Sequence, residues 1–321
     1  MFPLRPQSRL LPGPDPALWR AIVLAGVGIW RPAARLLAQT GQDWDRRAFY
    51  VEKLACAGGW LWPLWVRAWE RARPGDPDAA LVRARAQVSL AWRLRGGGYA
   101  NQTASWRFRL FHRALFKARQ NLFDAALLNP DDPCPYSAEI WPALGLGYNE
   151  DMMRELWEEI VKRAPHHFEA HYNALQYWSG KWRGSHEKAR VFAEQAADGA
   201  PAGTLMAALP LFAWYETYEA RGSRRDFRSR EARSMVDAAL ADMEAAAGHP
   251  ALPYVQHLVA YCLTKQGRHR EALRHFRAVD GWVGSVPWRY RGCQRLAYRG
   301  VRTAAARGAV IEAVRRWLRR G

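Results

Sequence analysis

From Ala17 onward, apolar residues recur mostly three and four positions apart, and no stretch alternates apolar and polar residues for long. Spacing of three and four places side chains on one face of an α-helix, whereas a half-buried strand requires alternation. The pattern therefore predicts an all-α protein. Residues 1–16 contain five prolines and no regular period. We expect them to form an extended N-terminal segment before one helical domain at 17–321.

Short breaks interrupt the helical pattern at regular intervals. Pro130, Pro165 and Pro201 lie 35 and 36 residues apart. Proline cannot continue one helix but is well suited to the first turn of the next. A period near 34 residues is typical of helix–turn–helix repeats. The spacing predicts a solenoid of antiparallel helical hairpins with degenerate repeats, best defined over about 105–286.

One repeat, near 253–286, is clearer than the others and contains the stretch LVAYCLTKQGRHREALRHFRAV. Small residues at Ala260 and Ala272 would let two helices approach, Gly267 would form the turn, and Phe276 would fill the space between hairpins. This arrangement resembles a tetratricopeptide repeat. A second stretch, 184–201, shares the second half of the pattern. The resemblance implies that the protein binds a protein or peptide partner in a concave groove lined by the first helix of each hairpin.

Two phrases, APHHFEAHYNALQYW and KWRGSHEKARVFA, also resemble an actinomycete family of helical-repeat proteins without an assigned function. This second resemblance implies the same fold and no mechanism.

Histidine, aromatic and arginine residues within these two phrases provide the candidate partner-binding cluster. Tyr, Trp and Arg dominate binding hot spots, and the cluster contains all three. Its members are His167, His171, Tyr172, Trp178, Trp182, Arg183 and His186. A packing role for the aromatic residues is an equal alternative. A further alternative is an enzyme on a helical-repeat frame, with His171 and His186 in a closed pocket.

The net charge of +18 comes from two segments. Residues 81–120 contain nine Lys or Arg and no acid, and residues 285–321 contain ten Arg and a single acid, Glu312. Such segments are suited to a phosphate backbone or an acidic protein surface. Nucleic-acid binding through these two segments is therefore the main alternative to a protein adaptor, and two solvated helix faces would also explain them.

The first basic segment contains a predicted helix over about 105–128. Arg109, Arg113 and Lys117 are four residues apart and form one basic patch along it. We expect Trp106 and Leu110 to lie on other faces, where they can be buried.

The second basic segment contains a predicted C-terminal helix over about 302–320. Its apolar stripe consists of Val310, Ile311, Val314, Trp317 and Leu318, and its basic residues are Arg315, Arg316, Arg319 and Arg320. We interpret it as a capping helix whose apolar stripe packs on the last repeat. A basic amphipathic helix lying on a membrane surface is the alternative.

Other classes of site find little support in the sequence. The four cysteines are far apart and form no CxxC pair, which favours buried thiols in a reducing cytoplasm. His167 and His171 lack a third ligand at zinc-motif spacing, so we predict no metal and no cofactor. We find no signal peptide, and no apolar run long enough to span a membrane.

Overall fold

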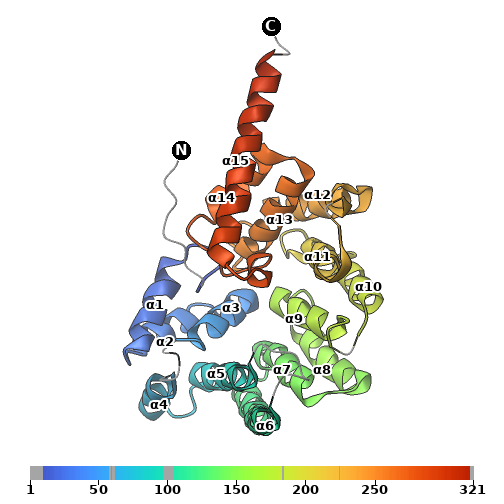
Figure 1. Cartoon of the computed structure of the whole chain (residues 1–321). Helices are drawn as coiled ribbons and strands as arrows, with labels where there is room; N and C mark the ends of the chain where they lie inside the picture. The colour runs from blue at the N-terminus through green and yellow to red at the C-terminus, as the bar shows by residue number, and fades with distance from the viewer. Residues whose placement is uncertain are drawn as a thin grey trace. The chain divides into compact units, whose positions relative to one another are not determined.

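The computed structural model describes residues 10–57, 59, 62–96, 104–182, 184–223 and 225–318. This part of the chain consists of α-helices joined by loops and short 3-10 helices, and it contains no β-strand (Figure 1). The prediction of an all-α protein is confirmed for these residues. No helix in this part combines the length and apolar character that crossing a bilayer requires.

The chain divides into two compact units, which are described separately. Unit 2 comprises Pro16–Gly184, and unit 1 combines Met1–Asp15 with Ser185–Gly321. The helices of unit 2 are α1 Pro16–Gly26, α2 Arg31–Ala38, α3 Trp44–Leu54, α4 Trp62–Ala72, α5 Pro77–Arg95, α6 Ser105–Leu128, α7 Cys134–Leu146, α8 Glu150–Arg163 and α9 Phe168–Trp178. Those of unit 1 are α10 His186–Ala197, α11 Leu209–Arg221, α12 Arg230–Ala245, α13 Leu252–Gln266, α14 His269–Ala278 and α15 Gln294–Leu318.

In unit 2, α6 packs along α5 and α7 (Figure 1). Its inward face is apolar, and residues such as Leu115 and Ala118 are fully buried against these neighbours. The approach to α7 is close at Gly145, where an added Cβ would lie 2.3 Å from the Leu115 side chain. Only a residue without a side chain fits there, because packed interiors leave no room for an extra methyl group.

A buried ionic group joins three segments of unit 2. The Arg47 guanidinium on α3 lies 2.6 Å from Asp78 in the first turn of α5 and 2.6 Å from Asp132 just before α7. Asp132 also accepts a hydrogen bond from the Cys134 backbone N–H at 2.8 Å, at the start of α7. Because each charge has a partner, the group can be buried without an unpaired ion, and it fixes α5 and α7, the two helices that support α6.

In unit 1, α13 and α14 form the helix–turn–helix expected at 253–286. Gly267 has a positive φ of 83°, a left-handed conformation that ends α13 and that glycine adopts without strain. Ala260, Ala272 and Phe276 are fully buried, as the packing argument from the sequence requires.

The described part of the N-terminal segment belongs to unit 1 and lies against α13. Leu11 is fully buried, and the carbonyl oxygen of Pro12 accepts a hydrogen bond from His257 Nε2 at 2.8 Å. His257 Nδ1 accepts a second hydrogen bond, from Trp288 Nε1, at 3.0 Å. Burial lowers the pKa of His257 to about 4. The ring is therefore neutral near pH 7, with one nitrogen donating and the other accepting.

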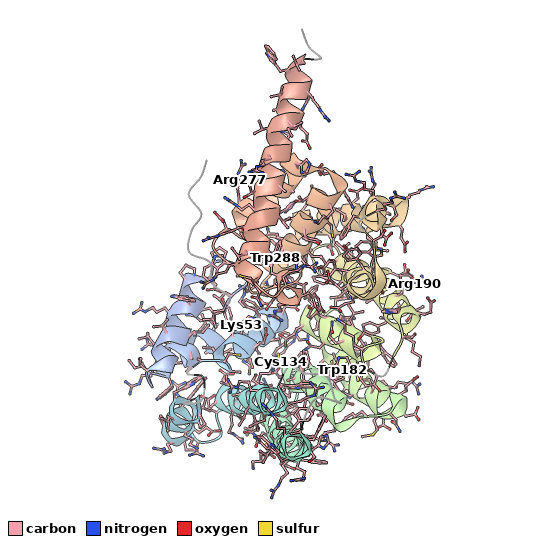
Figure 2. The ribbon with its side chains drawn as sticks, viewed as in Figure 1. Lys53, Cys134, Trp182, Arg190, Arg277 and Trp288 are labelled. Carbon is pink, nitrogen blue, oxygen red and sulfur yellow. The ribbon has the colours of Figure 1, made fainter. Side chains whose placement is uncertain are left out.

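The C-terminal helix α15 begins at Gln294, eight residues before the predicted start. Its first turns are anchored by the buried Tyr298, whose hydroxyl donates to the Phe276 carbonyl at 3.3 Å and whose ring packs against Trp288. Trp288 is labelled in Figure 2. The prediction relied on the apolar stripe at 310–318 and therefore missed this earlier anchor.

The cysteines divide between buried and exposed positions. Cys134 and Cys262 are buried, as expected, whereas Cys56 and Cys293 are exposed free thiols. The expectation of buried thiols is therefore wrong for two of the four.

Candidate partner-binding surface

The two histidines on which the predicted site centres lie inside unit 2. His167, which precedes α9, is 1% exposed, and its Nε2 lies 3.3 Å from the Trp44 carbonyl oxygen. His171 Nδ1 lies 2.9 Å from the His167 carbonyl oxygen, and the His171 ring packs edge-on against Trp157. Both side chains hold α9 within its unit.

Burial also lowers the pKa of His171 to about 4, so the ring is neutral near pH 7. Within the residues that the structure describes, no group of three or more His, Cys, Asp or Glu side chains could hold a metal ion. His171 therefore has the environment of a packing residue.

The aromatic members of the predicted site are half-buried. Tyr172 stacks on Phe168 with ring centroids 6.3 Å apart. Trp182 packs edge-on against Trp92 at 5.4 Å. Trp178 packs in the same manner against its neighbour Tyr177.

Two predicted members lie elsewhere. Arg183 is outside the described residues. His186 begins α10 in unit 1, and its Nδ1 lies 3.1 Å from the Thr217 hydroxyl. The predicted residues are thus engaged mainly with neighbours in their own units.

A more accessible surface lies on the outward face of α6. At about 100° per residue, its buried side chains occupy one arc and its exposed side chains occupy the opposite arc. The buried arc holds Phe111, Leu115, Ala118, Leu122 and Ala125. The outward arc holds Trp106, Arg109, Leu110, Arg113, Phe116, Lys117, Phe123 and Leu127. We call these eight residues the α6 face.

The apolar members of the α6 face are large and accessible to solvent. Their exposed fractions range from 40% for Leu110 to 65% for Leu127. The expectation that Trp106 and Leu110 are buried is wrong, because α5 and α7 cover only the Phe111 and Leu115 side of the helix. Clustered exposed apolar side chains mark interaction sites more often than isolated ones.

The cations of the α6 face have no partners in the part of the chain that the structure describes. The side chains of Arg109, Arg113 and Lys117 are exposed, and they form no hydrogen bond or ion pair with any described residue. Arg107 and Arg119 on the same helix differ, since Arg107 donates to the Leu94 carbonyl at 2.9 Å and Arg119 lies 3.3 Å from Glu139. The three free cations can therefore pair with acidic groups of another molecule without breaking existing contacts.

The second basic patch is on α15. Arg315 and Arg316 are exposed, whereas Arg319 and Arg320 lie outside the described residues. The apolar stripe of α15 is exposed as well, from 51% at Val314 to 75% at Trp317. The expectation that this stripe packs on the last repeat is wrong, because α15 contacts the rest of unit 1 through its opposite side, with Tyr298 and Ala305.

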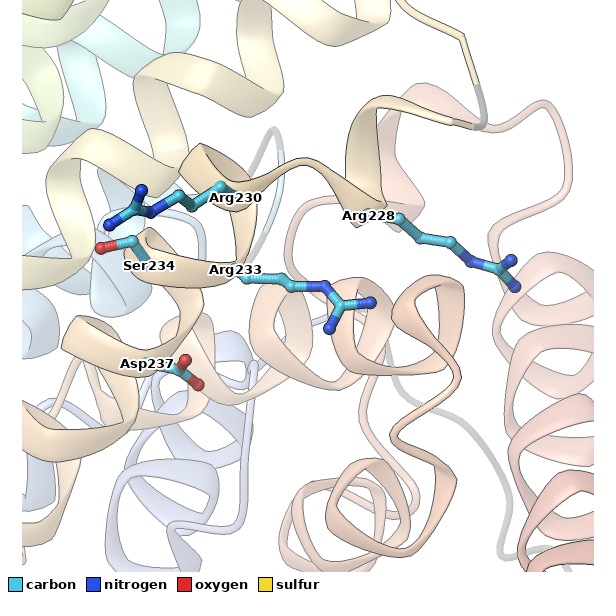
Figure 3. A pocket seen from close by; sticks show the side chains of 5 residues that line it. All are labelled: Arg228, Arg230, Arg233, Ser234 and Asp237. Atoms are coloured by element: carbon cyan, nitrogen blue, oxygen red, sulfur yellow. The ribbon is translucent and has the colours of Figure 1, made fainter.

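A shallow depression near the start of α12 is lined by Arg228, Arg230, Arg233, Ser234 and Asp237. The Arg230 and Arg233 side chains extend in different directions, so they do not converge on one point (Figure 3). Asp237 is already paired with Arg268. The depression therefore lacks the geometry of a preformed anion site.

Comparison of the chain with protein-family models, with curated proteins and with solved structures found no match.

Proposed function

We propose that this protein is a helical-repeat adaptor that binds an acidic, amphipathic protein segment along the α6 face. The observation that supports it most is the combination, on one helix face, of five large exposed apolar side chains with three cations that have no partner among the described residues. A partner with apolar residues and carboxylates at helical spacing would satisfy both groups at once.

The spacing of the face favours a helical partner. Phe116, Phe123 and Leu127 are seven and four residues apart and fall within an arc of about 40°. Apolar residues with this spacing form the contact line along which one helix packs on another. Leu110 and Leu127 also favour protein over nucleic acid, since aliphatic side chains cannot stack on bases.

The repeat architecture is part of the same proposal. In unit 2, α5 packs on α6, α7 packs on α8, and α7 contacts both α5 and α9. Tetratricopeptide-like hairpins that stack in order would produce these contacts. A cytoplasmic location, expected from the cysteines, belongs to this proposal as well.

The test uses the full chain and two helical peptides that share a leucine face and differ only in Glu or Lys on the other face. We expect the Glu peptide to bind in a calorimetric titration and the Lys peptide not to bind. Phe116→Ser/Phe123→Ser should weaken binding by about tenfold or more, because it removes two apolar contacts. Met152→Ser/Val161→Ser, which removes exposed apolar side chains from α8, should leave binding unchanged. Equal binding of both peptides would contradict the proposal.

Nucleic acid is the second candidate, because Trp106, Phe116 and Phe123 are exposed aromatic side chains beside the free cations. Such a surface can stack bases and contact phosphates. If it binds nucleic acid, single-stranded DNA should bind with an affinity that falls steeply with salt. Binding of single-stranded DNA should also be lost in the triple variant Arg109→Gln/Arg113→Gln/Lys117→Gln. Absence of DNA binding at low salt removes this candidate.

A further inference from the structure

The last turns of α15 form a second unpartnered surface, in a different unit from the α6 face. The first half of α15 packs on α14, and the contacts continue as far as Glu312. The Glu312 carboxylate accepts a hydrogen bond from the backbone N–H of His269 at 3.1 Å. From position 313 to 318 every residue is exposed. Figures 1 and 2 show this end of α15 extending beyond α13 and α14, with side chains on all sides.

The exposed apolar residues of α15 lie opposite its packing face. Tyr298 and Ala305 are buried on one side of the helix. At about 100° per residue, Val314 lies about 160–180° away from them and Val310 about 120–140° away. The protein's own packing therefore leaves the apolar stripe free to contact something else.

Apolar and basic residues are separated on these turns. Val310, Ile311, Val314, Trp317 and Leu318 fall within an arc of about 120°. Arg315 lies about 40° beyond one border of that arc, Arg316 lies on the opposite side of the helix, and two more arginines follow in the sequence. The only acid of the helix, Glu312, already holds the first turn of α14. On the α6 face, in contrast, cations and apolar residues are interleaved.

We propose that the C-terminal turns of α15 lie on an anionic lipid surface. An apolar arc with arginines on the rest of the helix suits the boundary between acyl chains and negatively charged headgroups, and tryptophan is favoured at that depth. Charge complementarity selects this partner over a second copy of the chain. Two copies of the C-terminal turns of α15 would bring Arg315 and Arg316 of each copy together with only one glutamate per copy, Glu312, which is already engaged.

The stripe is short, so the expected association is peripheral and reversible. A few apolar side chains and a few arginines bind a bilayer weakly, and each contribution depends on the other. Binding should therefore need anionic lipid and should weaken as salt screens the arginines.

The experiment uses the full chain and co-sedimentation with two kinds of vesicle, phosphatidylcholine alone and phosphatidylcholine with phosphatidylserine. We expect binding only to the second kind. Val314→Ser/Trp317→Ser should weaken binding by about tenfold or more. Arg315→Gln/Arg316→Gln should also weaken binding, by about tenfold. Circular dichroism should show unchanged helix content in both variants, since these residues are exposed.

Two control variants separate this inference from the proposed function. Arg230→Gln/Arg233→Gln removes the same charge from exposed positions on α12 and should bind vesicles like the unmodified chain. Phe116→Ser/Phe123→Ser disables the α6 face and should also bind them normally.

Three results would overturn the inference. The first is no binding to phosphatidylserine vesicles, and the second is unchanged binding of Val314→Ser/Trp317→Ser. The third is a lipid-free dimer, detected by light scattering, that Val314→Ser/Trp317→Ser dissociates, because the stripe would then be occupied by a second copy.

Discussion

The helices α6 and α15 have similar sequences but differ in how much of their length packs against neighbouring helices. Both are long and arginine-rich, and both have exposed apolar residues. The helix α6 is supported along its length by α5 and α7, whereas α15 is anchored in its first turns and unsupported in its last. The comparison teaches that a basic amphipathic sequence does not specify its own role. The packing of neighbouring helices determines which side chains stay exposed and can contact a partner.

The largest expected difference concerns core packing. Leu115→Ala on α6 should lower the free energy of unfolding by about 2–5 kcal/mol, because it opens a cavity between α6 and α7. Val310→Ala on α15 should change it by about 0.5 kcal/mol or less, since that side chain is exposed. Urea unfolding followed by circular dichroism measures both, and similar losses would remove the distinction between the helices.

A second difference concerns acid sensitivity. Tyr298 in the first turns of α15 packs against His257, a buried titratable group, with ring centroids 6.0 Å apart, whereas the buried side chains of α6 are not titratable. Burial lowers the His257 pKa from 6.5 to about 4, so the folded chain binds this proton less readily than the unfolded chain. The stabilising effect is complete above about pH 6.5 and is lost as the pH falls towards 4, by up to about 3 kcal/mol.

The measurement is the free energy of unfolding as a function of pH, compared with that of His257→Gln. The variant should be less stable at neutral pH and should show a shallower decline between about pH 6.5 and 4. If the free energy of unfolding depends on pH identically in both proteins, His257 does not contribute to the acid sensitivity.

A third comparison uses one glycine near each helix. Gly145→Ala should destabilise unit 2 by about 1–3 kcal/mol, because the new Cβ would collide with Leu115. Gly300→Ala within α15 meets no atom within 4 Å. It should stabilise the protein by about 0.5–1 kcal/mol through higher helix propensity. Thermal unfolding of the two variants tests these opposite signs.

The smallest expected effects concern single cations. Lys117→Gln should change stability by about 0.5 kcal/mol or less, because Lys117 has no partner among the described residues. Arg302 on α15 lies 3.3 Å from Asp280, and both side chains are largely buried. Arg302→Gln should therefore cost about 1 kcal/mol. A larger loss for Lys117→Gln would reveal an intramolecular role for the α6 face.

Local periodicity predicted much of the fold. It placed α6 at Ser105–Leu128 and the turn at Gly267, since both depend on spacing within one element. It could not decide which apolar side of a helix is covered. Trp106 and Phe111 are equally apolar, and only the positions of α5 and α7 expose one and bury the other.

The candidate site was harder to predict for the same reason. The sequence placed His167 among the candidate partner-binding residues, but its side chain is buried and its Nε2 lies 3.3 Å from the carbonyl oxygen of Trp44, 123 positions earlier. No spacing rule reveals a contact over that distance. The free cations of α6 were predictable, because the surrounding segment contains no acid.

The attachment of the N-terminal segment to α13 has a consequence for the order of folding. The hydrogen bond between His257 and Pro12 joins residues 245 positions apart, and the whole of unit 2 lies between them in the sequence. On a ribosome, unit 2 can complete its contacts while the first residues still lack their binding site. Unit 1 can complete its fold only after α13 has been synthesised and has bound the N-terminal segment. This step closes a long loop and is slow because of the loop-closure entropy. The segment around Pro12 can therefore reach its native position only after α13 has been synthesised.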